Sequence, residues 1–298
     1  IDEFININQF KKKNGKRFSI KDLKIFNNKI YVSYTKELED DCWNTSVIFT
    51  GLNYKELIFK ELFSPKECVN AINNIDKEFN ALSSGGRIID FDQNHILLTV
   101  GDYRNRYLAQ KKDSVFGKII KIDINTGQSE LVSLGHRNPQ GLFFDNQNNF
   151  ILATEHGPLG GDEINLIEIN KENTPNYGWA VASYGEHYGD FKENFEKYKK
   201  YPLLKSHKNN GFIEPIKYFP AYSHIGISEI IGLGSNKSYV ASSLVDKSLY
   251  FFNLDINNQI QNLERVEIGE RIRDLIFYNN KLILFLENTA SIGIINLQ

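Results

Sequence analysis

The sequence predicts an all-β fold, and more specifically a β-propeller of four-stranded antiparallel blades. Its apolar runs are short, rich in aromatic and β-branched residues, and broken by Asn, Gly and Asp pairs. Runs of this kind, about ten residues apart, are typical of strands in an all-β domain. Clear examples are residues 29–34, 88–91, 95–100, 150–153 and 281–285. Helical periodicity is scarce, and only residues 190–201 are expected to form a short helix.

One two-strand pattern recurs along the chain and predicts the blades. It consists of an apolar strand, a turn with Asn or Asp, and a second, more apolar strand, at 23–33, 88–98, 142–152, 230–240 and 275–284. The copies lie roughly 45 to 90 residues apart, and four-stranded units at such periods indicate propeller blades. Each copy then forms the two inner strands of a blade, so five blades are expected.

The last predicted blade, from Ile272, has only three strands before the chain ends at Gln298. Residues 4–10 are the candidate for its fourth, outer strand, because closing the ring in this way would remove open sheet edges. The alternative is that a blade is missing from the front of the chain. In either case we expect residues 1–298 to form a single propeller domain.

Composition excludes several classes of partner. The chain has 298 residues and a formal net charge of -2, which gives no reason to expect a nucleic acid or an anionic membrane. No apolar run approaches the length of about 18 residues that a membrane span needs. The two cysteines, Cys42 and Cys68, are compatible with one disulfide in an oxidising compartment or with two free buried thiols. Methionine is absent, so a processed or trimmed N-terminus is expected, and we predict a periplasmic or secreted protein.

The unusual loops are predicted to gather on one face. In a four-stranded antiparallel blade, the link into the first strand and the link between the second and third strands emerge at the same end. Polar or glycine-rich segments fall in these links, at 85–87, 101–102, 135–141, 155–163, 222–226, 242–247 and 270–274. Taken singly, each is compatible with ordinary turn chemistry or a salt-bridged surface. Together they indicate a functional mouth.

These segments also resemble those of a known family. Residues 135–141 (GHRNPQG), followed by 155–158 (EHGP), 161–166 (GDEINL), 176–179 (NYGW) and 183–186 (SYGE), are similar to the glucose/sorbosone dehydrogenase family. The resemblance extends from about Leu23 to the C-terminus. It implies a six-bladed propeller that binds pyrroloquinoline quinone (PQQ) and calcium and oxidises a small-molecule aldose sugar.

The resemblance assigns roles to individual residues. Arg137 and Asn138 would face the quinone as catalytic and cofactor-binding residues, with the arginine stabilising charge on the reduced cofactor. Three further cations would bind the carboxylates of PQQ: Lys247, Arg271 and Arg273. The backbone carbonyls of Gly157 and Pro158 would hold the calcium beside the quinone, since calcium prefers oxygen donors. A second, structural calcium would lie near Asp162, Glu163 and Tyr177.

The general base that sugar oxidation needs is missing from its expected place. The family carries a histidine just before the Gly-Arg that opens a blade, whereas residues 80–87 here read NALSSGGR. The corresponding residue is Ser83, or Leu82 if one glycine is inserted, and neither is a base. Two hypotheses follow: a PQQ- and calcium-dependent sugar dehydrogenase with another base, or a sugar- or cofactor-binding propeller without catalysis. A metal-dependent, lactonase-like hydrolase is a third, weaker hypothesis.

Overall fold

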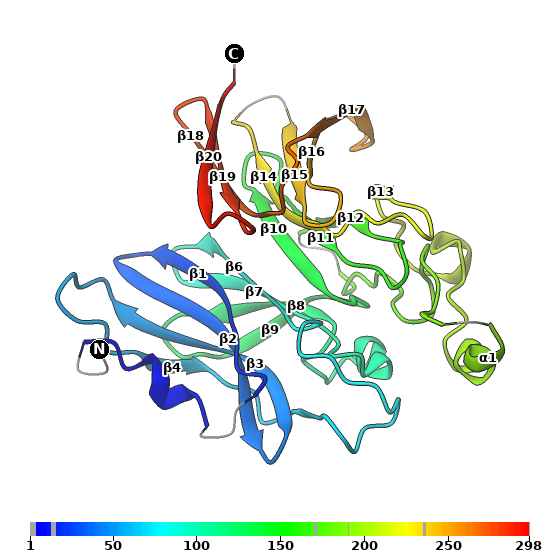
Figure 1. Cartoon of the computed structure of the whole chain (residues 1–298), viewed down its shortest axis with the longest axis horizontal. Coiled ribbons are helices and arrows are strands. Elements are labelled where there is room, and N and C mark those ends of the chain that lie inside the picture. Colours follow the sequence, from blue (N-terminus) through cyan, green and yellow to red (C-terminus); the bar gives the residue numbers. More distant parts are fainter. Residues whose placement is uncertain (1–3, 13–15, 170–171, 190, 235–236, 298) are drawn as a thin grey trace. The chain divides into compact units, whose positions relative to one another are not determined.

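The computed structural model describes residues 4–12, 16–169, 172–189, 191–234 and 237–297. These residues form five antiparallel sheets in chain order, together with a single α-helix (Figure 1). The predicted all-β fold of propeller blades is therefore confirmed. The chain divides into two compact units, Ile1–Pro139 and Gln140–Gln298, called here the N-terminal and C-terminal units.

The N-terminal unit contains the first two sheets. The first has the order β1-β2-β3-β4, with the short strand β5 also paired to β3; its strands are β1 (Ile20–Phe26), β2 (Lys29–Glu39), β3 (Cys42–Gly51), β4 (Lys60–Phe63) and β5 (Val69–Asn70). The second sheet consists of β6 (Gly85–Asp92), β7 (His95–Val100), β8 (Lys118–Asp123) and β9 (Ser129–Leu134). Short 3-10 helices cover Ile7–Phe10 and Arg106–Gln110.

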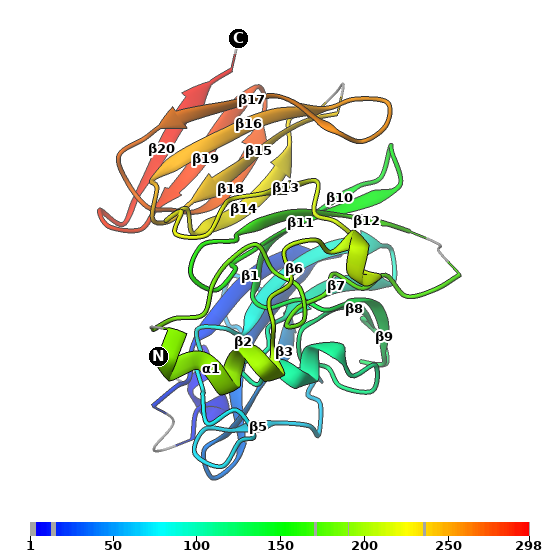
Figure 2. The ribbon, with the colours of Figure 1, turned by 90° about the vertical axis from the view of Figure 1, so that its right-hand side faces the viewer.

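The C-terminal unit contains the other three sheets. The third consists of β10 (Pro139–Asp145, whose first residue closes the N-terminal unit), β11 (Phe150–Glu155), β12 (Glu163–Glu168) and β13 (Lys217–Tyr218). The fourth consists of β14 (Ile227–Gly232), β15 (Ser238–Ser243), β16 (Ser248–Leu254) and β17 (Ile260–Glu267), and the fifth of β18 (Ile272–Tyr278), β19 (Lys281–Leu286) and β20 (Ser291–Asn296). In the side view of Figure 2 the fourth and fifth sheets run next to each other, with β14 against β18.

The connection between β12 and β13 is long, and it carries the helix α1 (Phe191–Lys200), as predicted, and a 3-10 turn at Lys208–Asn210.

Asparagine pairs explain the tightest hairpins. Asn27 and Asn28 have φ values of 48° and 56°, and Asn279 and Asn280 have φ values of 49° and 56°. Positive φ at both central residues is the geometry of a two-residue type I′ turn, which asparagine tolerates well. The flanking pairs Phe26↔Lys29 and Tyr278↔Lys281 therefore begin the β1–β2 and β18–β19 ladders. In these two hairpins, the turn of the strand–turn–strand pattern that predicted the blades has a defined geometry.

Apolar side chains fill the space between neighbouring sheets. In the N-terminal unit, Tyr31, Ile88 and Ile96 belong to the cluster between the first two sheets, and the alternate residues Ile30 and Val32 of β2 face a second cluster. Because successive side chains of a strand point to opposite faces, β2 is buried on both sides. In the C-terminal unit, similar clusters lie between the third and fourth sheets and between the fourth and fifth.

Residues 4–10 do not complete the last blade, so that prediction was wrong. Ile5 forms a bridge with Leu57 instead, and Asn6 bonds with the backbone of Phe59. The reason is hydrophobic: Ile5, Ile7 and Phe10 cover the outer core cluster of the first sheet. Within the described residues the fifth sheet keeps three strands, and Ile292 and Ile294 of its edge strand are 62% and 61% exposed.

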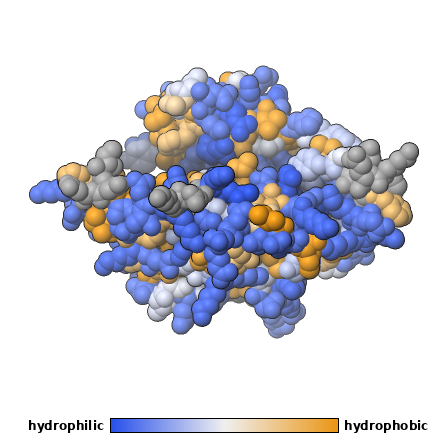
Figure 3. All heavy atoms as spheres, turned by 60° about the horizontal axis from the view of Figure 1, so that its bottom comes forward, coloured by the Kyte–Doolittle hydropathy of each residue, from blue (hydrophilic) through white to orange (hydrophobic). Residues whose placement is uncertain are grey.

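Two predictions from composition have structural outcomes. Cys42 and Cys68 form a disulfide with a Cα–Cα distance of 5.4 Å. Of the two alternatives that the sequence left open, a disulfide or two free thiols, the structure shows the disulfide. None of the described helices is long and apolar enough to cross a membrane. On the face drawn in Figure 3, hydrophobic residues form small scattered patches among hydrophilic ones.

Lys118, on β8, is a fully buried cation that ties the second sheet to its loops. Its ammonium donates to the carbonyl oxygens of Leu108, Ala109 and Phe116 at 2.9, 3.0 and 2.5 Å. Burial lowers the pKa of Lys118 to about 8, although Glu67 and Asp113 oppose the shift. This lysine therefore satisfies three backbone acceptors at a cost in desolvation.

We predict that Lys118→Met destabilises the protein by about 2 to 4 kcal/mol, because three buried carbonyls lose their donor. The loss should grow as pH rises above about 8. Over that range folded Lys118 releases its proton while the unfolded lysine keeps it, so the wild type gains stability with pH. Urea unfolding at several pH values measures both effects, with exposed Lys112→Met as the control. A pH-independent difference between wild type and variant would contradict the role of the buried charge.

Candidate functional site

In the N-terminal unit, Arg137 and Asn138 lie at the end of the second sheet where β6 begins and β7 ends. The backbone N–H of Asp102, just after β7, donates to the carbonyl of Arg137 at 2.8 Å. The N–H of Gly85, the first residue of β6, donates to Oδ1 of Asn138 at 3.1 Å. Both side chains are buried. The structure thus brings three of the predicted segments, 85–87, 101–102 and 135–141, into one group.

Ser83 is one of the two candidate positions for the missing histidine, and its side chain is anchored. Its hydroxyl donates to the Asp102 carboxylate at 2.9 Å, and the same oxygen accepts the N–H of Arg104 at 2.8 Å. A Cβ on Gly101 would lie 2.2 Å from the Ser83 carbonyl oxygen, so only glycine permits this close approach. Ser83 is 3% exposed whereas Leu82 is 72% exposed. Of the two candidate positions, Ser83 is therefore the one that contacts Asp102.

The six histidines of the chain are distributed over both units. His95 lies at the start of β7, about 20 Å along the strand from the end where Asp102 follows. Buried His136 pairs with Ser133, and buried His187 with the carbonyl of Tyr201. The remaining three belong to the C-terminal unit, where His156 is half-buried, His207 buried and His224 exposed.

In the C-terminal unit, Asp162 holds the loop that carries Gly157 and Pro158. One carboxylate oxygen accepts the N–H of Gly157 at 3.1 Å, and the other accepts the N–H of Ile227 at 2.9 Å. A Cβ on Gly157 would lie 2.3 Å from the carbonyl oxygens of Gly160 and Gly161, so the loop folds tightly around a glycine. The Pro158 carbonyl accepts the Tyr188 hydroxyl at 3.0 Å and retains a second lone pair. The geometry gives Asp162 a loop-positioning role. The second lone pair of the Pro158 carbonyl oxygen could coordinate a cation.

Glu163 forms a buried acid pair with Glu155. The two residues are direct cross-strand partners at the ends of β11 and β12, and both are buried. Burial, together with the charge of Glu155, raises the pKa of Glu163 well above its usual range. Nearby, Asn165 donates to Glu163 at 3.3 Å, but its buried Oδ1 accepts no hydrogen bond. Tyr177 is also buried, and its hydroxyl donates to the carbonyl of Leu166, on the same strand as Glu163, at 2.6 Å.

His207 and Glu214 extend this acidic site, although no sequence pattern selects them. Nε2 of buried His207 lies 3.6 Å from Glu163, and its Nδ1, which has no hydrogen-bond partner, lies 3.7 Å from Glu214. Burial lowers the pKa of His207. Glu214 also accepts the hydroxyl of Tyr184 at 2.7 Å, and that ring stacks on Tyr218. Both residues come from the irregular connection before β13, where no periodicity marks them.

The donors around Glu163 fit a hard cation. A divalent ion would neutralise the repulsion between Glu155 and Glu163 and would use the unpaired oxygen of Asn165, as calcium does with carboxylate and amide ligands. Within the described part of the chain, no group of three or more His, Cys, Asp or Glu side chains is arranged to hold a metal by itself. Any calcium site here therefore depends on amide and backbone oxygens as well.

The predicted cationic residues of the C-terminal unit converge on the loop before β18. The Lys247 carbonyl accepts the N–H groups of Ile268 and Gly269, which places exposed Lys247 beside the arginines. Arg271 donates to the Leu244 carbonyl at 3.3 Å and lies 3.5 Å from Glu287. Arg273 also binds Glu287, at 2.5 Å, so both arginines extend the same way, as their alternation on a strand predicts.

Comparison with known proteins gives consistent matches. The family model described as Glucose / Sorbosone dehydrogenase matches residues 24–295. An uncharacterized protein of Synechocystis sp. is 30% identical over 218 residues, covering 64% of this chain and 50% of that protein. Aldose sugar dehydrogenase YliI of Escherichia coli is 26% identical over 270 residues, covering 83% of this chain and 67% of that protein. The chain thus spans half the length of the first of these relatives.

Solved structures show the same fold. The soluble aldose sugar dehydrogenase of Escherichia coli in its apo-form has a TM-score of 0.75 at 21% identity, over 94% of this chain and 83% of that one. The PQQ-bound aldose sugar dehydrogenase of Streptomyces coelicolor has a TM-score of 0.65 at 20% identity, over 89% and 71%. Such identities support a shared architecture and leave the site to be argued from its residues.

We predict that calcium raises the melting temperature of the wild type and that Glu163→Gln removes most of this rise. A ligand at 100 times its Kd stabilises by about 2.7 kcal/mol, which is a measurable shift. In EDTA, Glu163→Gln should be at least as stable as the wild type, because one of two facing carboxylates is neutral. Exposed Glu172→Gln serves as the matched control. Equal calcium responses in all three proteins would contradict a cation site at Glu163.

Proposed function

The chain belongs to the glucose/sorbosone dehydrogenase family, and from this premise we propose that it is a PQQ- and calcium-dependent oxidoreductase of aldose sugars. The observation that carries the proposal is the match over residues 24–295 together with the anchored loop segments at 135–141 and 155–163. A relative of this chain is named an aldose sugar dehydrogenase, and a structural neighbour with the same fold is described as PQQ-bound. The substrate class and both cofactors are proposals for this chain.

The residues that would hold PQQ are mainly cationic. Arg137 and Asn138 would face the quinone, and Lys247, Arg271 and Arg273 would bind its carboxylates. Glu287, which now pairs with both arginines, is half exposed and can be displaced at low cost, because an exposed ion pair is worth little. When bound, PQQ supplies the oxidant that accepts a hydride from C1 of the sugar.

The oxygen donors in the C-terminal unit fit the calcium part of the proposal. The carbonyls of Gly157 and Pro158 would hold the ion beside the quinone, and Asp162 would position their loop through its two backbone hydrogen bonds. Glu163, with Tyr177 nearby, would belong to the second, structural ion. The unpaired Asn165 oxygen supports a cation in that place.

The missing histidine favours a second candidate function, a sugar- or cofactor-binding propeller without catalysis. Oxidation at C1 requires that the hydroxyl proton leave to a base, and the Ser83 hydroxyl is not one at neutral pH. Asp102, the carboxylate that would orient a histidine at this position, is retained and accepts Ser83 instead. In this second candidate function, the proposed binding residues would still hold the ligand while no base takes the proton.

The disulfide supports the proposed location. Disulfides persist in oxidising compartments and are rare where thiols are kept reduced. The Cys42–Cys68 bond of the N-terminal unit therefore agrees with a periplasmic or secreted protein. Fractionation of the native host, with this protein detected by antibody, would test the location.

Titration with PQQ and calcium, followed by dye reduction with glucose and other aldoses, tests the proposal directly. Binding of both ligands with sugar-dependent dye reduction is the expected result for the dehydrogenase. Binding without reduction would overturn it in favour of the non-catalytic candidate. If neither ligand binds, both candidates fail.

We predict that Ser83→His raises sugar-dependent dye reduction by at least about 100-fold, the lower range of general-base catalysis. The imidazole would lie beside Asp102, which would fix its orientation. Leu82→His is the matched control, because residue 82 is exposed and does not contact Asp102. The gain should disappear in Ser83→His/Asp102→Asn. An equal gain in Leu82→His would show that Asp102 plays no part.

A further inference from the structure

A separate cavity of about 450 Å³ opens in the N-terminal unit, next to the loop that carries Ser83. Two segments form most of its wall: residues 16–19 lead into β1, and residues 79–82 lead into β6. Because both segments precede the first strand of a sheet, they lie at the same end of the unit as Asp102 and Asn138. A cavity of this volume is large enough for a monosaccharide.

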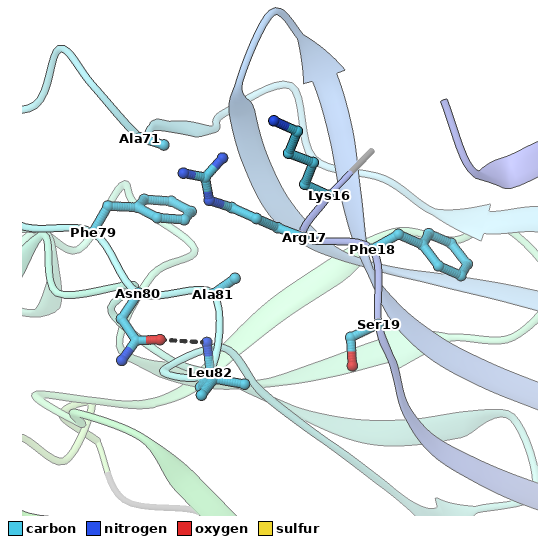
Figure 4. Close-up of a pocket in the computed structure, with 9 residues that line it drawn as sticks. All are labelled: Lys16, Arg17, Phe18, Ser19, Ala71, Phe79, Asn80, Ala81 and Leu82. Atoms are coloured by element: carbon cyan, nitrogen blue, oxygen red, sulfur yellow. Dashed lines mark hydrogen bonds between the residues drawn. The ribbon is translucent and has the colours of Figure 1, made fainter. Parts of the chain in front are cut away.

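The charged and amide side chains of this cavity present hydrogen-bond donors. Figure 4 shows Lys16 and Arg17 extending to the same side of the cavity, toward Ala71 and Phe79, while Phe18 points away. Within the described residues the Lys16 ammonium has no hydrogen-bond or ion-pair partner. The Oδ1 of Asn80 accepts the N–H of Leu82 at 2.8 Å, which leaves the amide NH₂ as a donor.

Arg17 is held in place by two contacts. Its guanidinium lies 5.1 Å from the centre of the Phe79 ring, and one of its nitrogens pairs with Asp41. Asp41 is fixed in turn by the indole N–H of Trp43 at 2.9 Å. Asp41 balances the charge of Arg17. The charge of Lys16 is not balanced in this way, because no carboxylate lines the cavity, so the cavity carries one uncompensated positive charge.

The rest of the wall is apolar. Ala71, Ala81 and Leu82 line the cavity, and Leu82 is largely exposed to solvent. An occupant that satisfies both parts of the wall carries an anionic group for Lys16 and Arg17 and a compact body with C–H surface for the alanines and Leu82. A monosaccharide that bears a carboxylate has this character.

We propose that this cavity binds the carboxylate of an acidic monosaccharide, of the uronic acid type. Lys16 is the principal anion partner, and Arg17 is a pre-positioned second donor. Leu82 directly precedes Ser83, so the ligand would lie beside the residue that contacts Asp102. The choice of a sugar as ligand rests on the proposed function, whereas the anion preference rests on the cavity alone.

Calorimetric titration of the cofactor-free protein with glucuronate, glucose and inorganic phosphate at low ionic strength tests the proposal. Glucuronate should bind at least about tenfold more tightly than glucose, since one charge-assisted hydrogen bond corresponds to about that factor. Lys16→Gln should weaken glucuronate binding by about tenfold or more and leave the weak glucose binding unchanged. Exposed Lys55→Gln, in the same unit, should change neither.

Three results would overturn the proposal: equal affinity for glucuronate and glucose, an unaffected Lys16→Gln variant, or phosphate binding as tight as glucuronate. The last would replace the acidic sugar by a simple anion. Because no quinone or turnover is involved, glucuronate binding without dehydrogenase activity would sink the proposed function and leave this inference intact. Dehydrogenase activity on neutral aldoses without glucuronate binding would do the reverse.

Discussion

Buried serine and threonine hydroxyl groups tie the strands of neighbouring sheets together within each unit. Ser33 of β2 donates to the Gly86 carbonyl of β6, and Thr99 of β7 donates to the Pro139 carbonyl at 3.0 Å. Thr154 of β11 donates to the Ser228 carbonyl, and Ser228 donates to the Ile272 carbonyl at 2.7 Å while bonding with Ser242 of β15. Thr99 and Thr154 also accept N–H groups from the first strand of their own sheets. Within each unit, these hydroxyl groups fix the inner strands of neighbouring sheets, in an interior where an unmade hydrogen bond would be costly.

This arrangement determines where the loops can go. Thr99, Thr154 and Ser242 are each the next-to-last residue of their strand, so the links that follow begin at a constrained position. Buried carboxylates then hold the links. Asp102 accepts hydrogen bonds from the Ser83 hydroxyl and the Arg104 N–H. Asp162 accepts hydrogen bonds from the N–H groups of Gly157 and Ile227. Bonds from backbone N–H to a carboxylate are stronger than neutral ones. Loops anchored in this way can present their remaining groups to a ligand in a fixed geometry.

Much of the fold was predictable because its signals are local. The Asn-Asn turns and the alternating apolar strands identify the hairpins, and α1 follows from its own short segment. Residues 4–10 were misassigned because their apolar pattern fits a strand, whereas their preferred position is set by the open face above Phe59 and Val32, which no local pattern shows. Likewise, sequence counting leaves Ser83 and Leu82 equivalent, and tertiary contacts distinguish them: Ser83 is buried against Gly101 and Asp102, whereas Leu82 is exposed.

The acidic site shows a similar limit. Glu155 and Glu163 flank a loop in the sequence, and their direct pairing follows once the two strands are joined as a hairpin. His207 and Glu214 are brought to the same place by the long connection before β13, whose path depends on packing such as the stack of Tyr184 on Tyr218. Tertiary contacts of this kind leave no periodicity in the sequence.

The two buried acidic groups differ in how well the protein itself satisfies them. Asp102 accepts hydrogen bonds from the Ser83 hydroxyl and from the Arg104 N–H. Glu163 faces Glu155 in a buried position, beside an Asn165 oxygen that has no donor, and burial together with the charge of Glu155 raises the pKa of Glu163. Like charges buried together are retained at a cost in stability, and a bound divalent ion removes that cost. The two carboxylates thus differ in kind: Asp102 accepts hydrogen bonds from its neighbours, whereas the pKa of Glu163 is raised by burial and by the charge of Glu155, a repulsion that a bound cation would relieve.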